Sequence, residues 1–178
     1  MLIEKFISKS NKEIEIHLPE KNDLENLLDF ANRLIEDDNF LMFGSQKLTR
    51  EEEEKYLDSL ILSVQNKTVL AIFAKFNGRI IGACDIYKGR TRKAHVGTVG
   101  VTIDRDFRGD GIGKKLLSFI LDNASNIGLK MACLDLFDIN EEAKSLYKKY
   151  GFIEYGRLSK ALLWRGKYCD EIMMYKDI

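Results

Sequence analysis

The sequence is poor in cysteine, histidine and proline. It contains three cysteines, two histidines and one proline in 178 residues. The cysteines Cys84, Cys133 and Cys169 are odd in number and far apart, and no CxxC pair occurs. This pattern does not support a disulfide framework or a cysteine zinc site, so we interpret the thiols as small buried hydrophobic groups. No metal is expected, because every possible ligand pair on a helix has a simpler interpretation as surface.

The sequence also lacks a net charge and a long apolar run. Lysine plus arginine and aspartate plus glutamate number 28 each, so no positive field is available to bind nucleic acid. No window approaches the roughly 18 apolar residues that cross a bilayer, and the first twelve residues do not resemble a secretion signal. We therefore expect a cytoplasmic protein with no membrane partner. Its length predicts a single domain over residues 1–178.

Hydrophobic periodicity and turn residues predict alternating strands and helices. The predicted strands span residues 13–18, 68–76, 79–87, 94–103, 130–137, 152–157 and 171–175. The predicted helices span residues 24–35, 50–64, 112–127 and 140–150. Asn77-Gly78 predicts a hairpin between two of the strands, and a loop with Trp164 and Tyr168 is expected between the last two. The order of elements predicts an α+β (mixed α/β) fold.

A glycine-rich turn joins the strand ending near Ile103 to the helix that follows it. The segment Arg108-Gly109-Asp110-Gly111-Ile112-Gly113 places unpaired backbone N–H groups at the positive end of a helix dipole, which suits a phosphate. The Walker spacing fails, because only three residues separate Gly109 from Gly113. A Rossmann site also fits poorly, because Lys114 stands where a glycine is needed.

The spacing of the turn instead resembles the coenzyme-A signature of the GNAT acetyltransferases. That signature, Arg-x-x-Gly-x-Gly, is matched by Arg108, Gly111 and Gly113. A second match runs from Asn140 through Ala143, Leu146 and Tyr147 to the pair Gly151-Phe152. The resemblance is strong from about residue 97 to residue 156, and the preceding part matches only in its order of elements.

The resemblance implies a fold, a cofactor and an activity. The fold would be a central, largely antiparallel sheet of about seven strands flanked by about four helices. The activity would transfer an acetyl group from acetyl-CoA to an amine by direct attack in a ternary complex. The residues implied in cofactor binding are Val101, Thr102, Ile103, Arg108, Gly109, Asp110, Gly111, Ile112, Gly113, Lys114 and Asn140.

The acceptor is less defined by the sequence than the cofactor. The C-terminal segment looks like that of members that acetylate small amines or protein N-termini, so we expect a small-molecule or peptide amine as the partner. A homodimer is compatible with the sequence. The alternative function is a non-catalytic acyl-CoA sensor, which would keep the glycine turn without a working acid and base.

The resemblance assigns Tyr147 as the acid that protonates the departing CoA thiolate, and places Asn140 beside the cofactor arm. Each residue has a structural alternative. Tyr147 lies on the apolar stripe of its helix, where core packing would also explain it. Asn140 stands at the helix start, where its side chain can act as the N-cap.

The sequence does not identify a single residue as the general base. Asp135 occupies a position where some family members carry a glutamate base, so it is our catalytic candidate. For the other carboxylates we expect solvated surface, and the histidines have no recognisable partner in the sequence. These competing groups are Asp85, Glu36, Asp37, Asp38, His17 and His95.

Overall fold

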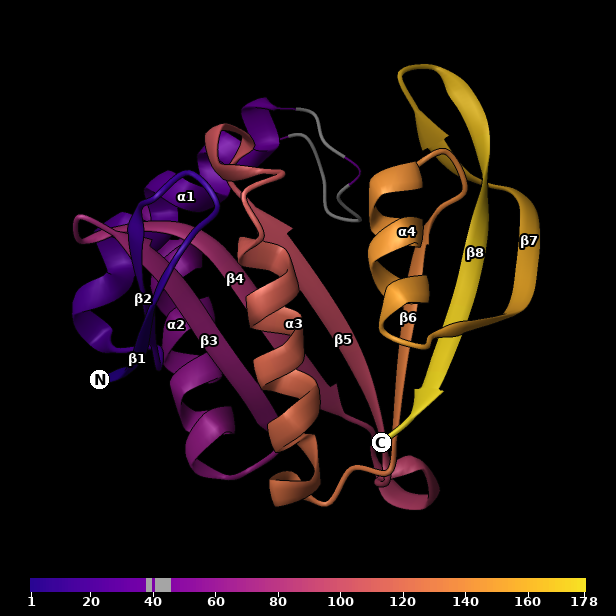
Figure 1. Cartoon of the computed structure of the whole chain (residues 1–178), viewed down its shortest axis with the longest axis horizontal. Helices are drawn as coiled ribbons and strands as arrows, with labels where there is room; N and C mark the ends of the chain where they lie inside the picture. The colour runs from indigo at the N-terminus through magenta and orange to yellow at the C-terminus, as the bar shows by residue number, and fades with distance from the viewer. Residues whose placement is uncertain (38–39, 41–45) are drawn as a thin grey trace.

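The computed structural model describes residues 1–37, 40 and 46–178, and its centre is one mixed sheet. Eight strands of this described part pair in the order β1-β2-β3-β4-β5-β6-β8-β7 (Figure 1). Every pairing is antiparallel except that of β5 with β6. The strands are β1 (Leu2–Ile7), β2 (Glu13–His17), β3 (Val69–Phe76), β4 (Arg79–Lys88), β5 (Val96–Ile103), β6 (Met131–Phe137), β7 (Ile153–Trp164) and β8 (Lys167–Asp177).

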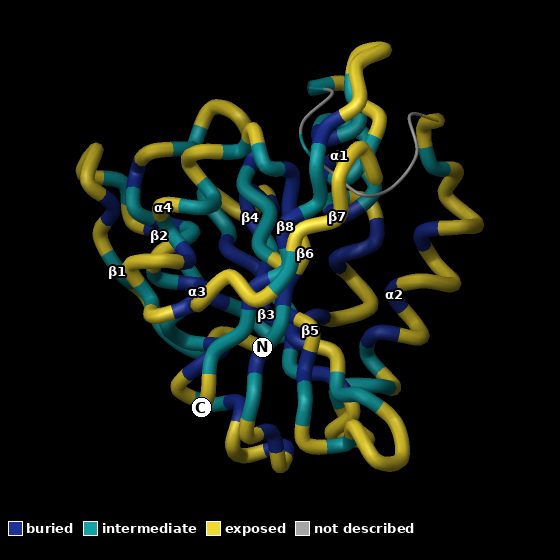
Figure 2. The backbone as a smooth tube through the Cα atoms, turned by 90° about the vertical axis from the view of Figure 1, so that its right-hand side faces the viewer, coloured by how far each residue is buried: buried dark blue, intermediate teal, exposed yellow. Residues whose placement is uncertain are grey.

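Four α-helices of the described part cover the two faces of the sheet. They are α1 (Leu24–Glu36), α2 (Arg50–Gln65), α3 (Ile112–Asn123) and α4 (Glu141–Lys149). Figure 2 shows the strands running between α2 on one side and α3 on the other. The buried side chains of α1 and α2 form one apolar cluster with β3 and β4, while α3 packs into a second and larger cluster on the opposite face. The predicted α+β fold with a largely antiparallel sheet is confirmed.

Local signals account for the helix ends. Thr49 accepts from the N–H of Glu52, and the Glu52 carboxylate accepts from the N–H of Thr49, which is a complete capping box at the start of α2. The turn after α3 ends at Gly128, where φ is 81°. Asn77 and Gly78 join β3 to β4 with φ of 49° and 78°, the left-handed values that a tight hairpin needs.

The outer strands differ from the expectation. β1 was not predicted, because this edge strand keeps one face in solvent and its sequence is rich in charge. β7 and β8 are longer than predicted and meet at Arg165-Gly166, with φ of 48° and 74°, so Trp164 and Tyr168 belong to strands and not to a loop. Most residues of β7 are exposed, and an exposed strand shows no apolar alternation in its sequence.

In the part of the chain that the structure describes, no helix is long and apolar enough to cross a membrane.

Candidate active site

The site is organised by the place where the sheet divides. β5 and β6 pair in parallel only at Val96↔Met131, Gly97↔Ala132 and Thr98↔Cys133. Beyond these pairs, β5 continues beside β4 up to Ile103, and β6 continues beside β8. The two half-sheets therefore diverge, and Figure 1 shows β5 and β6 spreading apart between α3 and α4. From Val99 to Ile103, the edge of β5 that faces β6 has main-chain groups that no strand of the described residues uses, and an extended ligand can bind such an edge.

The glycine turn lies at the wide end of this opening. Gly109 and Gly111 have φ of 73° and 85°, the left-handed conformation that glycine adopts without strain. The first helical bond of α3 runs from the N–H of Lys115 to the carbonyl of Gly111 at 3.1 Å. Within the described residues, the N–H groups from Gly109 to Lys114 have no acceptor. Six donors at a helix start fit the pyrophosphate of a coenzyme.

The side chains of the turn point away from these donors. Arg108 donates from Nε to the carbonyl of Ile103 at 3.1 Å, and its other end forms an ion pair with Asp37 at the end of α1. Asp110 is 9% exposed and accepts two hydrogen bonds from Ser10. The donors that face an anion are therefore main-chain groups, and a direct contact of Arg108 or Asp110 with a cofactor stays a prediction.

Val101 and Ile103 have side chains that hold α3 against β5. A β-carbon on Gly113 would lie 3.5 Å from Ile103 and 3.6 Å from Val101, so the first turn of α3 packs closely on the strand. Thr102 lies opposite Ala83 on the other face of the sheet. The predicted contact of these residues with a cofactor arm would therefore involve their main chains.

A buried ion cluster, which was not predicted from the sequence, lies between the end of β5 and the glycine turn. Asp104 directly follows β5 and is 4% exposed. Its Oδ2 accepts from Arg33 of α1 and from Arg79 of β4, both at 2.9 Å. Arg33 also donates to the carbonyl of Ile80 at 3.0 Å. The cluster joins three elements that are distant in sequence, and the only sequence signal is an acid immediately after a buried strand.

Tyr147 reaches the opening from the α4 side. The residue is 7% exposed, and its ring packs edge-on against Phe152 with a centroid distance of 5.4 Å. Burial raises the pKa of Tyr147, and the nearby Cys84 and Asp85 raise it further. Among the described residues, its hydroxyl has no hydrogen-bond partner. Core packing is thus present, and the hydroxyl is a proton donor that a ligand can still use.

Asn140 caps α4. Its side-chain oxygen accepts from the N–H of Ala143 at 3.1 Å, which is the N-cap interaction expected from its position. The amide nitrogen of the same side chain remains a potential donor, so the cofactor contact implied by the resemblance stays a prediction.

Asp85 and Asp135 lie on the same face of the sheet, the face covered by α1 and α2. Asp85 is half-buried and pairs across the strands with Gly100, while Asp135 is exposed on β6. A β-carbon on Gly100 would lie 3.4 Å from the Asp85 carboxylate, so this glycine leaves the carboxylate open to the surface. Burial raises the pKa of Asp85 to about 7 and also raises the pKa of Asp135. Asp85 differs from our expectation of solvated surface.

A buried glutamate and two phenols extend this polar face. Tyr56 of α2 and Tyr87 of β4 bring their hydroxyls within 3.3 Å of each other. Glu53 lies one turn before Tyr56 on α2, is 3% exposed, and has a pKa raised by burial. Burial is the main cause of the raised pKa of Tyr56, and Tyr87, Asp85 and Glu53 raise it further. Nothing in the sequence marks Glu53, because it is one of four consecutive glutamates.

The remaining candidates lie outside this group. Glu36 is exposed and forms an ion pair with Lys47, while Asp37 is used by Arg108. Asp38 lies outside the described residues. His17 contacts Glu15 at 3.0 Å, and His95 is exposed.

Three aromatic residues cluster at the end of the β7–β8 hairpin. Phe40 lies 5.6 Å from Phe137 of β6 and 4.7 Å from Trp164 of β7, measured between ring centroids. Phe137 lies two residues after Asp135 on the same face of β6. The cluster therefore walls the α1 and α2 face of the opening, whereas Tyr168 is 71% exposed.

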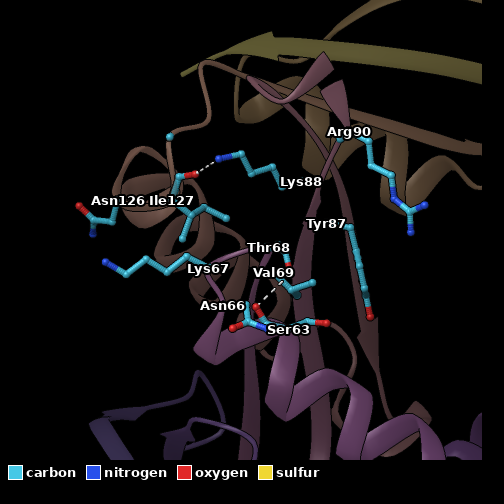
Figure 3. A pocket seen from close by; sticks show the side chains of 12 residues that line it. Ser63, Asn66, Lys67, Thr68, Val69, Tyr87, Lys88, Arg90, Asn126 and Ile127 are labelled. Carbon is cyan, nitrogen blue, oxygen red and sulfur yellow. Dashed lines mark hydrogen bonds between the residues drawn. The ribbon is translucent and has the colours of Figure 1, made fainter. Parts of the chain in front are cut away.

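A separate hollow of about 560 Å³ lies where β3 begins and β4 ends, far along β4 from the glycine turn (Figure 3). Lys67, Lys88 and Arg90 line it, and Lys88 donates to the carbonyl of Ile127 at 2.8 Å. None of the residues predicted for the site lines this hollow. Among the described residues, no group of His, Cys, Asp and Glu side chains is arranged to hold a metal ion.

Comparison with known proteins connects this geometry to a family. Residues 30–152 match the profile described as the Acetyltransferase (GNAT) family. The chain is 32% identical over 89 residues to N-alpha-acetyltransferase 30 of Schizosaccharomyces pombe, a match that covers 50% of the chain and 58% of that protein. It is 29% identical over 105 residues to the L-amino acid N-acetyltransferase AaaT of Escherichia coli, which covers 58% of the chain and 65% of that protein. These matches thus span less than two thirds of either curated relative.

Most of the fold also has a solved counterpart. The crystal structure of an acetyltransferase of the GNAT family from Streptococcus pneumoniae superposes with a TM-score of 0.83 at 28% sequence identity. The similarity covers 93% of this chain and 99% of that one. The resemblance therefore extends from the glycine turn to the N-terminal half, where sequence motifs are weak.

Proposed function

Because this chain belongs to the Acetyltransferase (GNAT) family, we propose that it transfers an acetyl group from acetyl-CoA to a primary amine. The observation that carries the proposal is the opening between β5 and β6 with six unpaired N–H groups at its wide end. An open strand edge suits the pantetheine arm, and the glycine turn suits the pyrophosphate. Few other ligands combine an amide-bearing arm with a pyrophosphate.

The chain's own groups would hold the cofactor as follows. The main chains of Val101 to Ile103 pair with the arm, and the N–H groups from Gly109 to Lys114 bind the pyrophosphate. Asn140 donates its side-chain amide to the arm while its oxygen caps α4. When bound, acetyl-CoA supplies a thioester that an amine can attack without a covalent enzyme intermediate.

The acceptor amine approaches from the α1 and α2 face. A free aliphatic amine is mostly protonated at neutral pH, so a group on this face must remove a proton before attack. Asp85 is the first candidate for the base, because its pKa of about 7 balances proton affinity against the fraction ionised at neutral pH. Asp135, the base inferred from the sequence, lies on the same face and is the second candidate.

Tyr147 acts on the opposite side of the reacting thioester. Its pKa is raised by burial, so the hydroxyl stays protonated at neutral pH and can donate to the departing sulfur. Main-chain donors of β5 would stabilise the negative charge that develops on the acetyl oxygen during attack.

The acceptor is a small amine or a peptide N-terminus. The names of the curated relatives support a primary amine as acceptor, since one is called an N-alpha-acetyltransferase and the other an L-amino acid N-acetyltransferase. The polar cluster of Asp85, Glu53 and the two tyrosines fits an amine that arrives as a cation.

The test combines binding and turnover. Calorimetry should detect binding of acetyl-CoA to the folded protein, and thiol release should follow with amino acids, free-N-terminal peptides, polyamines or amino sugars. A folded protein that binds no CoA thioester contradicts the proposal. Binding without thiol release across this panel would instead favour an acyl-CoA sensor.

A further inference from the structure

The turn between β1 and β2, residues Ser8 to Lys12, lies directly against the glycine turn although the two are 100 residues apart in sequence. Lys9 donates its N–H to the carbonyl of Asp110 at 3.2 Å. Ser10 donates both its N–H and its hydroxyl to the carboxylate of Asp110, each at 2.6 Å. We call these five residues the β1–β2 turn.

Asp110 is an unexpected residue in a turn that binds an anion. A carboxylate at the start of α3 would repel a phosphate group bound there. Its pKa is lowered, chiefly by the hydroxyl of Ser10, so the carboxylate is charged at neutral pH. The carboxylate points toward the β1–β2 turn, where the Nζ of Lys12 also lies 4.0 Å from its Oδ2. The acid therefore serves as an attachment point.

Lys9 is placed by this attachment at the rim of the phosphate turn. The stem of its side chain passes over Gly111, with carbons 3.6–4.0 Å from the position of a β-carbon on that glycine. Its Nζ donates to the carbonyl of Gly109 at 3.1 Å. An ammonium group has three donors, so two remain for another acceptor. The ammonium of Lys9 thus stands beside the N–H groups that begin at Gly109.

We propose that the β1–β2 turn is part of the coenzyme site. Asp110 is a positioning residue that fastens this turn to the glycine turn, and Lys9 provides positive charge for a phosphate group of the cofactor. The inference rests on the proposed function, because it assumes a CoA thioester as the ligand. It adds to that function a contact from the N-terminal hairpin, which lies outside the segment matched to the family.

The first experiment measures the Kd of CoA by calorimetry for Lys9→Met and Lys9→Arg. Methionine keeps an apolar stem over Gly111 but removes the charge, so the Kd should rise about 5- to 20-fold. Arginine keeps the charge and should retain most of the affinity. Lys5→Met is the matched control, because Lys5 lies on the same hairpin but pairs with Glu13 and Glu15. A Kd for Lys9→Met equal to that of the control overturns the proposal.

Truncated ligands identify which phosphate is involved. If Lys9 contacts the pyrophosphate, Lys9→Met should weaken the binding of 3'-dephospho-CoA as much as the binding of CoA. If Lys9 acts on the 3'-phosphate, the two proteins should bind 3'-dephospho-CoA equally. Either result supports the proposal. An equal loss with pantetheine, which carries no phosphate, would mean that the substitution damages the structure, and would overturn it.

Asp110→Asn separates positioning from simple electrostatics. Removing a negative charge beside an anion site should tighten CoA binding if the charge alone matters. If Asp110 positions the turn, the substitution should instead weaken binding several-fold in a protein that remains folded by circular dichroism. Ser10→Ala, which leaves the main-chain donor, should shift the Kd in the same direction by less. Tighter binding by Asp110→Asn overturns the positioning role.

The two levels of inference fail in different ways. A wild-type protein that does not bind CoA contradicts the proposed function itself. A wild-type protein that binds CoA, with Lys9→Met and Asp110→Asn unchanged, contradicts only the role of the β1–β2 turn.

Discussion

The two faces of the sheet carry different chemistry. On the α3 and α4 face, the core is apolar and the polar groups offered to a ligand are mainly main-chain donors of β5 and of the glycine turn. On the α1 and α2 face, side chains carry the polarity, with Asp85, Glu53 and the tyrosines Tyr56 and Tyr87 gathered near one another. The proposed cofactor site therefore depends on backbone geometry, whereas the proposed acceptor site depends on side chains from separate elements.

The largest expected effect comes from removing the base on the acceptor face. Asp85→Asn should lower kcat by about 100-fold or more, because the protonated amine loses its proton acceptor. The assay is thiol release at pH 8, where the wild-type carboxylate is ionised. Asp135→Asn is the matched control and should have a smaller effect. If Asp135→Asn is the more damaging change, the base assignment must be reversed.

On the other face, Tyr147→Phe should lower kcat by about 10- to 100-fold, because the departing thiolate loses its proton donor. The KM for acetyl-CoA should change little. Tyr150→Phe serves as the control just after the same helix, since the hydroxyl of Tyr150 donates to the carbonyl of Lys114 at 2.8 Å and holds the end of α4 on α3. Full activity in a folded Tyr147→Phe protein would leave Tyr147 with a packing role only.

The backbone character of the cofactor site is tested at Gly111. Gly111→Ala places a β-carbon on a residue with φ of 85°, which strains the turn and should raise the KM for acetyl-CoA about tenfold. Gly78→Ala is a matched control, because Gly78 has φ of 78° and open space around it but lies in the β3–β4 hairpin. It should lower Tm without changing KM. Equal KM values for the two variants would contradict the role of the turn.

The half-buried carboxyl of Asp85 should also make the stability of the fold depend on pH. Its pKa is about 7 in the folded protein and ordinary when unfolded, so the folded state binds the extra proton between about pH 4 and pH 7. Folding stability should therefore fall as pH rises through this range, by about 4 kcal/mol for a shift of about three pKa units. Urea unfolding at pH 5 and pH 8 measures the difference. Asp85→Asn should remove most of it, whereas a slope retained in that variant would point to another group.

The smallest effect on stability is expected at Glu53. This carboxyl group lies on the same buried face of α2 as the apolar residues Leu57 and Leu60. Its folded pKa is raised by burial, so the ionised form is disfavoured above the unfolded pKa. Glu53→Leu should raise Tm at pH 8 by about 2–4 °C, the shift that ~1 kcal/mol produces in a domain of this size. Glu54→Leu, at an exposed neighbouring position, should leave Tm nearly unchanged. A fall in Tm for Glu53→Leu would mean that the carboxylate is stabilising.

Parts of the fold were predictable because their signals are local. The capping box at Thr49, the hairpin at Asn77-Gly78 and the glycine that ends the α3 segment each depend on residues adjacent in sequence. β1 and the full length of β7 were missed, because exposed edge strands lack the apolar alternation that identifies a strand. The residues that the structure describes therefore form eight strands where about seven were expected.

The candidate site divides in the same way. The glycine turn is continuous in sequence, and so is the segment from Asn140 to Phe152. The spacing of residues within each segment therefore already resembled the family's motifs. Asp85 was expected on the solvated surface, and its burial follows only from its place opposite Gly100 under α1 and α2. The Asp104 ion cluster joins α1, β4 and the end of β5, and no sequence pattern connects these segments.

The sequence by itself determined the glycine turn, the helix boundaries and the family signature, because backbone conformation and capping depend on neighbouring residues. Only the tertiary structure decided which carboxylates are buried, where the sheet opens, and that Asp110 faces Ser10 across 100 residues of sequence. The physical reason is that desolvation and pairing depend on what the folded chain brings into contact. The same side chain is therefore surface in one fold and a candidate base in another.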